Sequence, residues 1–250
     1  MTNTACRTPG WIIVFAFVIV TSSARAVTFT GFGTVGGLSV SAAAEFSVIS
    51  ANTLTLKLTN TTLGGTPTRT QLLTGVFFTI DGADPTLSLS STALTAGSEL
   101  YTAATTHTGS ANLNVTGGYQ LVGYPGGSFP NNSNNMAFPY EYGISTVGMS
   151  GLFQGNIVGN DNYAIASAGT NFGLNTFKKA LPLVMSSVTF TIPGFNGLSD
   201  SQIGNVAFGY GSLPDAVIRS RDRVPEPGPI AMLLAAVSIL GICVRNRRRA

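Results

Sequence analysis

The sequence predicts an all-β protein whose central part is a single antiparallel β-sandwich. Three observations support this prediction. Short runs of apolar and β-branched residues alternate with a period of two, turns rich in Gly and Pro separate the runs, and helical periodicity is almost absent. The chain has 250 residues, of which 44% are apolar, so it can bury a sizeable core. Only its two ends depart from this pattern, because each carries a continuous apolar run.

The N-terminal end, residues 1–26, has the pattern of a secretory signal peptide. An apolar run from Trp11 to Val20 follows Arg7 and precedes Ala24-Arg25-Ala26. A run of this kind before a small-x-small site predicts a signal helix that signal peptidase removes by cutting after Ala26, with Ala24 and Ala26 as the site residues. The alternatives are a buried strand or a first membrane helix, but the run is short for the roughly 30 Å of a bilayer core.

The glycine pattern "GFGTVG", Gly31 to Gly36, matches the GxGxxG fingerprint of dinucleotide-binding loops. The fingerprint requires a preceding strand and a following helix in a βαβ unit. Here the pattern starts a few residues after the expected cut and no helical pattern follows. We therefore expect a flexible mature N-terminus and no dinucleotide.

The sandwich is expected over residues 27–212, and its clearest strand is "NTLTLKLTNTT". There Leu54, Leu56 and Leu58 alternate with polar residues, which places the leucines on one face of a half-buried strand. Turns are predicted at Gly64-Gly65, 81–85, Gly117-Gly118, 124–127 and Pro193-Gly194. Similar runs predict further strands at "AEFSVIS" from Ala44, "LLTGVFFTI" from Leu72, "TLSLSS" from Thr86, "ANLNVTG" from Ala111, "SVTFTI" from Ser187 and "GNVAFGY" from Gly204.

The C-terminal end combines a polar spacer, expected over residues 213–223, with an apolar segment and a basic tail. Pro229 to Val244 holds no charged residue, and its 16 residues would form about 24 Å of helix, enough for a single transmembrane span. Clustered arginines beside a span favour the cytoplasmic side, so the body is expected outside the cytoplasm. These arginines are Arg245, Arg247, Arg248 and Arg249.

The charge and cysteine content of the body exclude some partners. Six of the 13 basic and one of the 10 acidic residues lie outside residues 27–223, which leaves 7 and 9 and a net charge of about −2. Nucleic acid as a partner is therefore not expected, since phosphate binding needs a clustered basic face. Cys6 and Cys243 both lie in the ends, so no disulfide can form within the body.

Groups that could perform catalysis are scarce in the body, and no enzyme and no cofactor are expected. His107 is the only histidine and sits in a loop-like context, which makes a catalytic triad or a zinc site improbable. Asp81 with Asp84, or Asp161, could hold surface calcium, but ordinary turns explain them better. A glycosidase pair of carboxylates stays open, because its members need only meet in space.

One aromatic segment, Gly117 to Gly143, is a candidate sugar-binding surface. It combines asparagines with four tyrosines, and carbohydrate sites use apolar faces beside amide groups. The alternative, which we favour, is that the rings fill the sandwich. The candidate residues are Tyr119, Tyr124, Tyr140 and Tyr142.

The last residues, 224–250, carry the most specific signal of the sequence. Pro225-Glu226-Pro227, an apolar span and an arginine tail follow one another, and the chain has a signal peptide at its other end. This order resembles the PEP-CTERM sorting signal of Gram-negative bacteria. The prolines fix an extended, non-helical peptide, and Glu226 offers one carboxylate to a basic recognition group.

The resemblance implies a set of partners and a location. An exosortase, acting through a cysteine of its own, would cut near Pro225 to Pro227 after export through signal peptidase and the general secretion machinery. The precursor would sit transiently in the inner membrane, and the mature form would be at the cell surface or in the matrix, in the context of extracellular polysaccharide and biofilm. The implied role is structural or adhesive, and a surface carbohydrate-binding module is the alternative.

The body also resembles a family of exosortase-dependent surface proteins. The matching stretches are "LTLKLTNTT", "LLTGVFFTIDG", "YGISTVGMSGLF" and "IGNVAFGYGS".

Overall fold

The computed structural model describes residues 26–82, 84–103, 106–109, 118–129, 139–146, 162–171, 177, 182–211 and 216–225. These residues form strands and turns, with short 3-10 segments at Arg69–Gln71 and Asp200–Gln202, so the all-β prediction is confirmed. In this part of the chain no helix is long and apolar enough to cross a membrane. The expected signal helix and the expected membrane helix at 229–244 lie outside the described residues.

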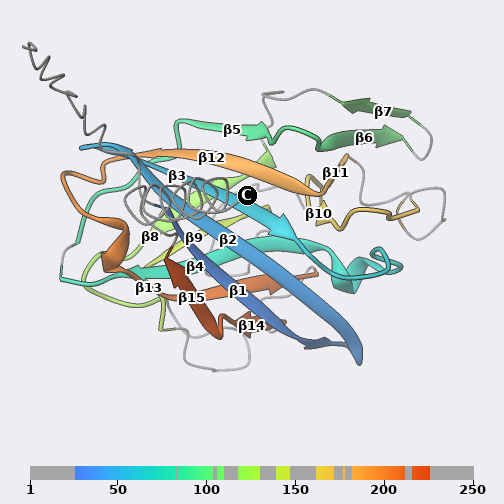
Figure 1. Ribbon diagram of the computed structural model, residues 1–250, viewed down its shortest axis with the longest axis horizontal. Helices are drawn as coiled ribbons and strands as arrows, with labels where there is room; N and C mark the ends of the chain where they lie inside the picture. The colour runs from blue at the N-terminus through green and yellow to red at the C-terminus, as the bar shows by residue number, and fades with distance from the viewer. Residues whose placement is uncertain are drawn as a thin grey trace, which may run out of the picture.

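The first sheet has six strands, and every pair within it is antiparallel. One of its two edge strands, the last strand among the described residues, lies beside the first strand (Figure 1). In spatial order the strands are β15 (Asp222–Pro225), β1 (Ala26–Val35), β2 (Leu38–Ser50), β3 (Thr53–Asn60), β12 (Ser187–Pro193) and β5 (Ser91–Leu94).

The second sheet has nine strands and departs from the predicted antiparallel pattern at one place. β10 and β11 pair in parallel, with Ile165 opposite Val184. β9 (Tyr142–Ser145) pairs with β4, and β8 (Gln120–Gly123) pairs with β9. The main path runs through β14 (Val217–Arg219), β13 (Ile203–Tyr210), β4 (Leu73–Ile80), β10 (Ile165–Ala166), β11 (Leu183–Met185), β6 (Glu99–Ala103) and β7 (Thr106–Gly109).

The two sheets face each other across one apolar core. Leu54, Leu56 and Leu58 are fully buried, as the alternation in β3 predicts. The ring of Phe46 on β2 meets that of Phe78 on β4 edge to face, with centroids 5.3 Å apart. A contact between side chains of different sheets is what defines a sandwich.

Of the seven predicted strands, five are present as β2, β3, β4, β12 and β13. The run "ANLNVTG" lies outside the described residues. The strand predicted at Thr86 is wrong, because residues 86–90 belong to no strand and β5 starts at Ser91. There the amides of Ser88 and Ser90 donate hydrogen bonds to the carbonyls of Pro193 and Thr191 on β12, ahead of the strand itself.

The flexible N-terminus predicted from "GFGTVG" is also wrong, because these residues belong to β1 and to its turn. Gly36 and Gly37 have φ of +57° and +78° and form the two-residue loop between β1 and β2, a geometry that favours glycine. Gly31 and Gly33 are needed for another reason. A Cβ at either position would lie 2.8 Å from the side chain of Phe208 or Ile218. The glycines therefore let β1 approach the second sheet closely.

The polar spacer predicted over residues 213–223 is likewise corrected. Residues 217–219 form β14 and pair with β13, and residues 222–225 form β15 and pair with β1. The segment thus returns to the sandwich and closes an edge of each sheet.

Candidate functional site

Two of the four candidate sugar-binding tyrosines are core residues. Tyr119 donates a hydrogen bond to the Tyr163 carbonyl at 2.6 Å, and its ring meets that of Phe190. Tyr142 donates to the Pro85 carbonyl at 2.8 Å and stacks on Phe78. Both rings are buried, so they offer no platform for a sugar, and the interpretation that these aromatics fill the sandwich holds for them.

The other two tyrosines belong to a small second core on the outer face of the second sheet. Phe77 of β4 points away from the main core and contacts the rings of Phe129 and Tyr140, each with centroids 6.0 Å apart. Tyr124 packs on Phe129 at 4.9 Å and is half-buried. This second core explains why every residue of β4 is buried, since both faces of the strand are covered.

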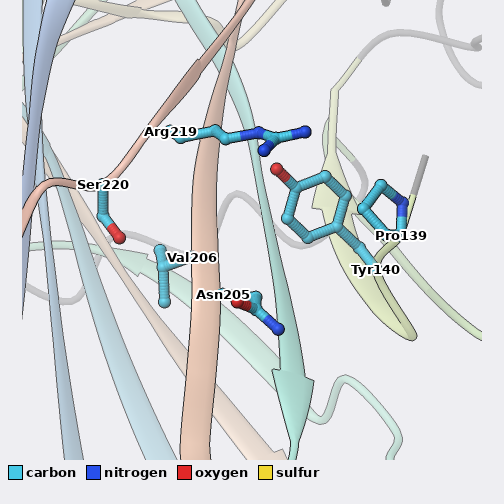
Figure 2. A pocket seen from close by; sticks show the side chains of 6 residues that line it. All are labelled: Pro139, Tyr140, Asn205, Val206, Arg219 and Ser220. Atoms are coloured by element: carbon cyan, nitrogen blue, oxygen red, sulfur yellow. The ribbon is translucent and has the colours of Figure 1, made fainter. Parts of the chain in front are cut away.

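A pocket of about 240 Å³ lies beside this second core. In Figure 2 the guanidinium of Arg219 on β14 points toward the hydroxyl of Tyr140, while Asn205 on β13 lies below them. Tyr140 is only 3% exposed, and its hydroxyl faces Arg219 (Figure 2). The lining residues are Pro139, Tyr140, Asn205, Val206, Arg219 and Ser220.

Asn205 occupies an unusual backbone position in this pocket. Its φ is +43°, and it lies within the register shift between Gly204 and Ala207 in the pairing of β13 with β4. A bulge of this kind redirects a side chain, and a non-glycine residue at positive φ costs about 1–3 kcal/mol. The Asn205 side-chain amide donates to the Thr79 hydroxyl at 3.4 Å. The bulge thus holds an exposed amide group at the pocket.

Arg219 and Tyr140 are electrostatically coupled. Burial raises the pKa of Tyr140, and the charge of Arg219 and its hydrogen bond to the hydroxyl partly offset that rise. The tyrosine hydroxyl accepts from the guanidinium and so fixes its position at the pocket wall. A guanidinium beside an amide and a serine hydroxyl can bind a carboxylate or the hydroxyl groups of a sugar.

After Arg219 the chain crosses from the second sheet to the first. The amide of Ser220 donates to Val206 of β13 at 2.8 Å, and the amide of Arg221 donates to Thr30 of β1 at 2.9 Å. Successive residues are therefore bonded to different sheets. The crossing therefore links one edge of the first sheet to one edge of the second.

The two arginines after the crossing lie on aromatic rings of β1. The Arg221 guanidinium is 4.3 Å from the ring centre of Phe32, and that of Arg223 is 5.8 Å from Phe29. Arg223 also donates to the Asp200 carbonyl at 3.2 Å. Each cation–π contact contributes about 0.5–1 kcal/mol at an exposed site. These contacts fasten β15 and the residue before it to β1.

The register of β15 brings the two predicted processing positions together. Val27 lies opposite Pro225, and Thr28 lies opposite Val224, in an antiparallel pair. Ala26, the expected signal peptidase residue, is the first residue of β1. The end of the expected signal peptide and the start of Pro225-Glu226-Pro227 therefore share one corner of the first sheet. Figure 1 shows β15 beside β1 at that edge.

The residues from 223 to 249 match the family model of the PEP-CTERM protein-sorting motif. The chain carries a PEP-CTERM sorting signal. No curated protein and no solved structure matches the chain. The PEP-CTERM motif implies export, targeting to the cell surface and processing by an exosortase, as the sequence predicts.

The PEP-CTERM match begins inside the folded body, because its first residues, 223–225, belong to β15. Pro225 is thus both the last residue of the strand and the first of the Pro-Glu-Pro triplet. Glu226, Pro227 and the arginine tail lie outside the described residues, and so does Ala24. The match does not cover residues 27–222, so the resemblance of the body to a surface-protein family stays a prediction.

The remaining candidates do not form a common site with the PEP-CTERM corner. His107 lies in β7 opposite Tyr101, not in the loop that the sequence suggested. Asp161 is outside the described residues. Asp81 accepts the Gln202 side-chain amide on its backbone carbonyl. Among the residues that the structure describes, no three His, Cys, Asp or Glu side chains gather as a metal site would require.

Of the six pocket residues only Tyr140 was a sequence candidate, and the polar residues Asn205, Arg219 and Ser220 were missed. Arg219 lies in a strand of three residues, which is too short for an alternation of apolar and polar residues to mark it. Nothing in the sequence indicates the bulge at Asn205, because it depends on how β13 pairs with β4.

Proposed function

We propose that the mature protein is a non-enzymatic component of the cell surface or extracellular matrix, with a structural or adhesive role in a polysaccharide context. The observation that supports the proposal is the PEP-CTERM signal. This signal directly continues β15, an edge strand of a sandwich with an apolar core. A body built this way needs neither a cofactor nor a reactive group to serve as a matrix element. The precursor is held in the inner membrane with its body outside until the exosortase acts.

The experiment changes the sorting triplet and follows mass and location together. In Glu226→Ala the carboxylate between the two prolines is lost, and we expect uncut precursor in the membrane fraction and less mature protein at the surface. Glu99→Ala on β6 is the matched control, since it removes a carboxylate far along the chain from the triplet. Mature wild-type protein that still carries residues 245–250 by mass spectrometry would contradict the proposal.

The Arg219 pocket supports a second candidate function, a carbohydrate-binding module. It places a guanidinium, an amide and a serine hydroxyl around a cavity of a size that admits part of a sugar ring. We propose residues 27–225 as the protein to apply to a glycan array, because β15 completes the sheet. Arg219→Gln should reduce binding at least tenfold, whereas Lys57→Gln on β3 should not. An array without any bound glycan removes this candidate.

An enzymatic role is tested separately. A hydrolase screen on the same protein should give no turnover. Turnover that is lost on His107→Ala would contradict the non-enzymatic proposal.

A further inference from the structure

We propose that the exosortase cuts on the C-terminal side of Pro225 and that β15 stays paired with β1 during and after the cut. This inference rests on the exosortase processing of the proposed function. It adds where the cut lies and in which folded state the body is accepted.

The first argument is how firmly the chain is held up to Pro225. Four residues of β15 pair in register with β1, from Asp222 opposite Thr30 to Pro225 opposite Val27. The two preceding residues are bonded through their amides to Val206 and Thr30. A backbone group that is paired in a sheet is not available to pair with an enzyme. A cut before Pro225 would therefore require β15 to leave the sheet first.

The second argument is what the departure of β15 would uncover. Val27 and Phe29 of β1 are 2% and 4% exposed, and β15 pairs with both. Removal of the strand would also leave the backbone groups of β1 unpaired along an open edge, which invites association with other chains. Arg221 and Arg223 would lose their places on Phe32 and Phe29. Retention of β15 avoids all three costs.

The third argument is that the triplet itself ends the ladder. Proline has no backbone N–H, so it is tolerated at the margin of a sheet but cannot continue one. Pro225 and Pro227 alternate with Glu226, which leaves a single amide among three residues. The sequence stops the strand where the recognition triplet begins. Pairing with β1 is thus described up to Pro225, and a cut beyond that residue leaves every described pair of β15 in place.

The cut needs a nucleophile of the exosortase and an acceptor molecule, which is water or an amine. One peptide bond breaks, its acyl carbon passes to the enzyme's nucleophile, and the new amine of the tail takes a proton. Water or an acceptor amine then displaces the enzyme and releases the body as an acid or an amide.

The test locks β15 to β1 with a disulfide. In Thr28→Cys/Val224→Cys the new thiols lie directly opposite each other, where Cα atoms of a ladder are about 4.5–5.5 Å apart and a disulfide fits. Cys243→Ser in the same chain leaves no other cysteine after residue 27. The single variants control for effects on signal peptidase. Ala43→Cys/Thr59→Cys locks β2 to β3 as a matched pair away from β15.

We expect the oxidised Thr28–Val224 variant to be converted to mature protein as fast as the wild type, in cells that contain the exosortase. Accumulation of its cross-linked precursor, relieved by a reductant and absent from the β2–β3 control, would overturn the proposal. If the disulfide does not form, the C-terminal peptide of the wild-type mature protein decides the question. It should end at Pro225 or later, and an end before Pro225 refutes the retention of β15. Both measurements follow precursor conversion alone, so they stand even if the mature protein has no role in the matrix.

Discussion

At the scale of single residues, Asn60 shows how the sandwich accommodates a buried polar group. Its side-chain amide donates to the carbonyls of Gln71 and Ile165 at 3.0 and 2.8 Å, and its oxygen accepts the Thr62 amide at 3.1 Å. These partners lie on segments far apart in the chain. One asparagine therefore joins the end of β3 to β10 and to the 3-10 turn.

Replacement of Asn60 by alanine should lower the free energy of unfolding by about 2–4 kcal/mol, because buried donors and acceptors are left without partners. Chemical denaturation monitored by circular dichroism measures the change. Asn52→Ala, at an exposed position, is the control and should stay within about 0.5 kcal/mol of wild type. Equal destabilisation by the two variants would contradict the role assigned to Asn60.

The buried tyrosines predict a loss of stability in alkali. Burial raises the pKa of Tyr142 to about 12, and the carboxylates of Glu141 and Asp84 add to the rise. Burial also raises the pKa of Tyr119 and Tyr210. The folded state holds the protons of these hydroxyls more tightly than the unfolded state does. The protonated tyrosines therefore contribute fully to the free energy of unfolding below about pH 10, and this contribution is lost as the pH rises from there toward 12.

Urea denaturation of the wild type and of Tyr142→Phe between pH 8 and 11.5 tests this expectation. The free energy of unfolding of the wild type should fall above pH 10, and that of the variant should fall less. If the free energy of unfolding fell equally with pH in the two proteins, Tyr142 would not be a cause of the pH dependence.

At the scale of elements, β1 shows how local sequence can mislead. Its glycines suggest a loop, yet Gly31 and Gly33 serve close packing against Phe208 and Ile218. The strand is recognised only when its neighbours are known. A Gly31→Ala substitution should therefore destabilise the body by about 2 kcal/mol through overpacking.

Thermal unfolding of Gly31→Ala and Gly127→Ala measures the effect of β1 packing. The control glycine has no heavy atom nearer than 3.4 Å to an added Cβ, so its substitution should be nearly neutral. If Gly31→Ala were equally neutral, the close approach of β1 to the second sheet would be contradicted.

The elements that sequence could predict share one property. β2, β3 and β12 have one face on the core and the other toward solvent, so alternation marks them. β14 and β15 are three and four residues long, too short for a period to emerge.

Of the sites, the sorting triplet was predictable because it is a contiguous motif. The Arg219 pocket was not, since Tyr140, Asn205 and Arg219 converge only through pairing of distant strands.

At the scale of the whole molecule, one core connects the two sheets without any covalent staple. A single apolar cluster contains Phe46 and Phe190 from the first sheet and Phe78 and Phe208 from the second. The body has no cysteine between residues 27 and 223. Its stability therefore rests on packing and on hydrogen bonds.

Unfolding of residues 27–225 should accordingly follow one cooperative transition, and its midpoint should not change when a reductant is added. Differential scanning calorimetry with and without dithiothreitol measures both properties. Two resolved transitions would mean that the sheets unfold independently, against the shared core.

The pairing of Val27 with Pro225 makes the backbone of the body nearly a closed ring. A linker of a few residues could join these two ends, and new ends could be opened at an exposed turn such as Gly64 or Gly82, giving a circular permutant with the same strands. Targeting segments can be attached or removed at this open corner without disturbing the order of the strands. The PEP-CTERM signal begins at this corner, and the predicted signal peptide would end there.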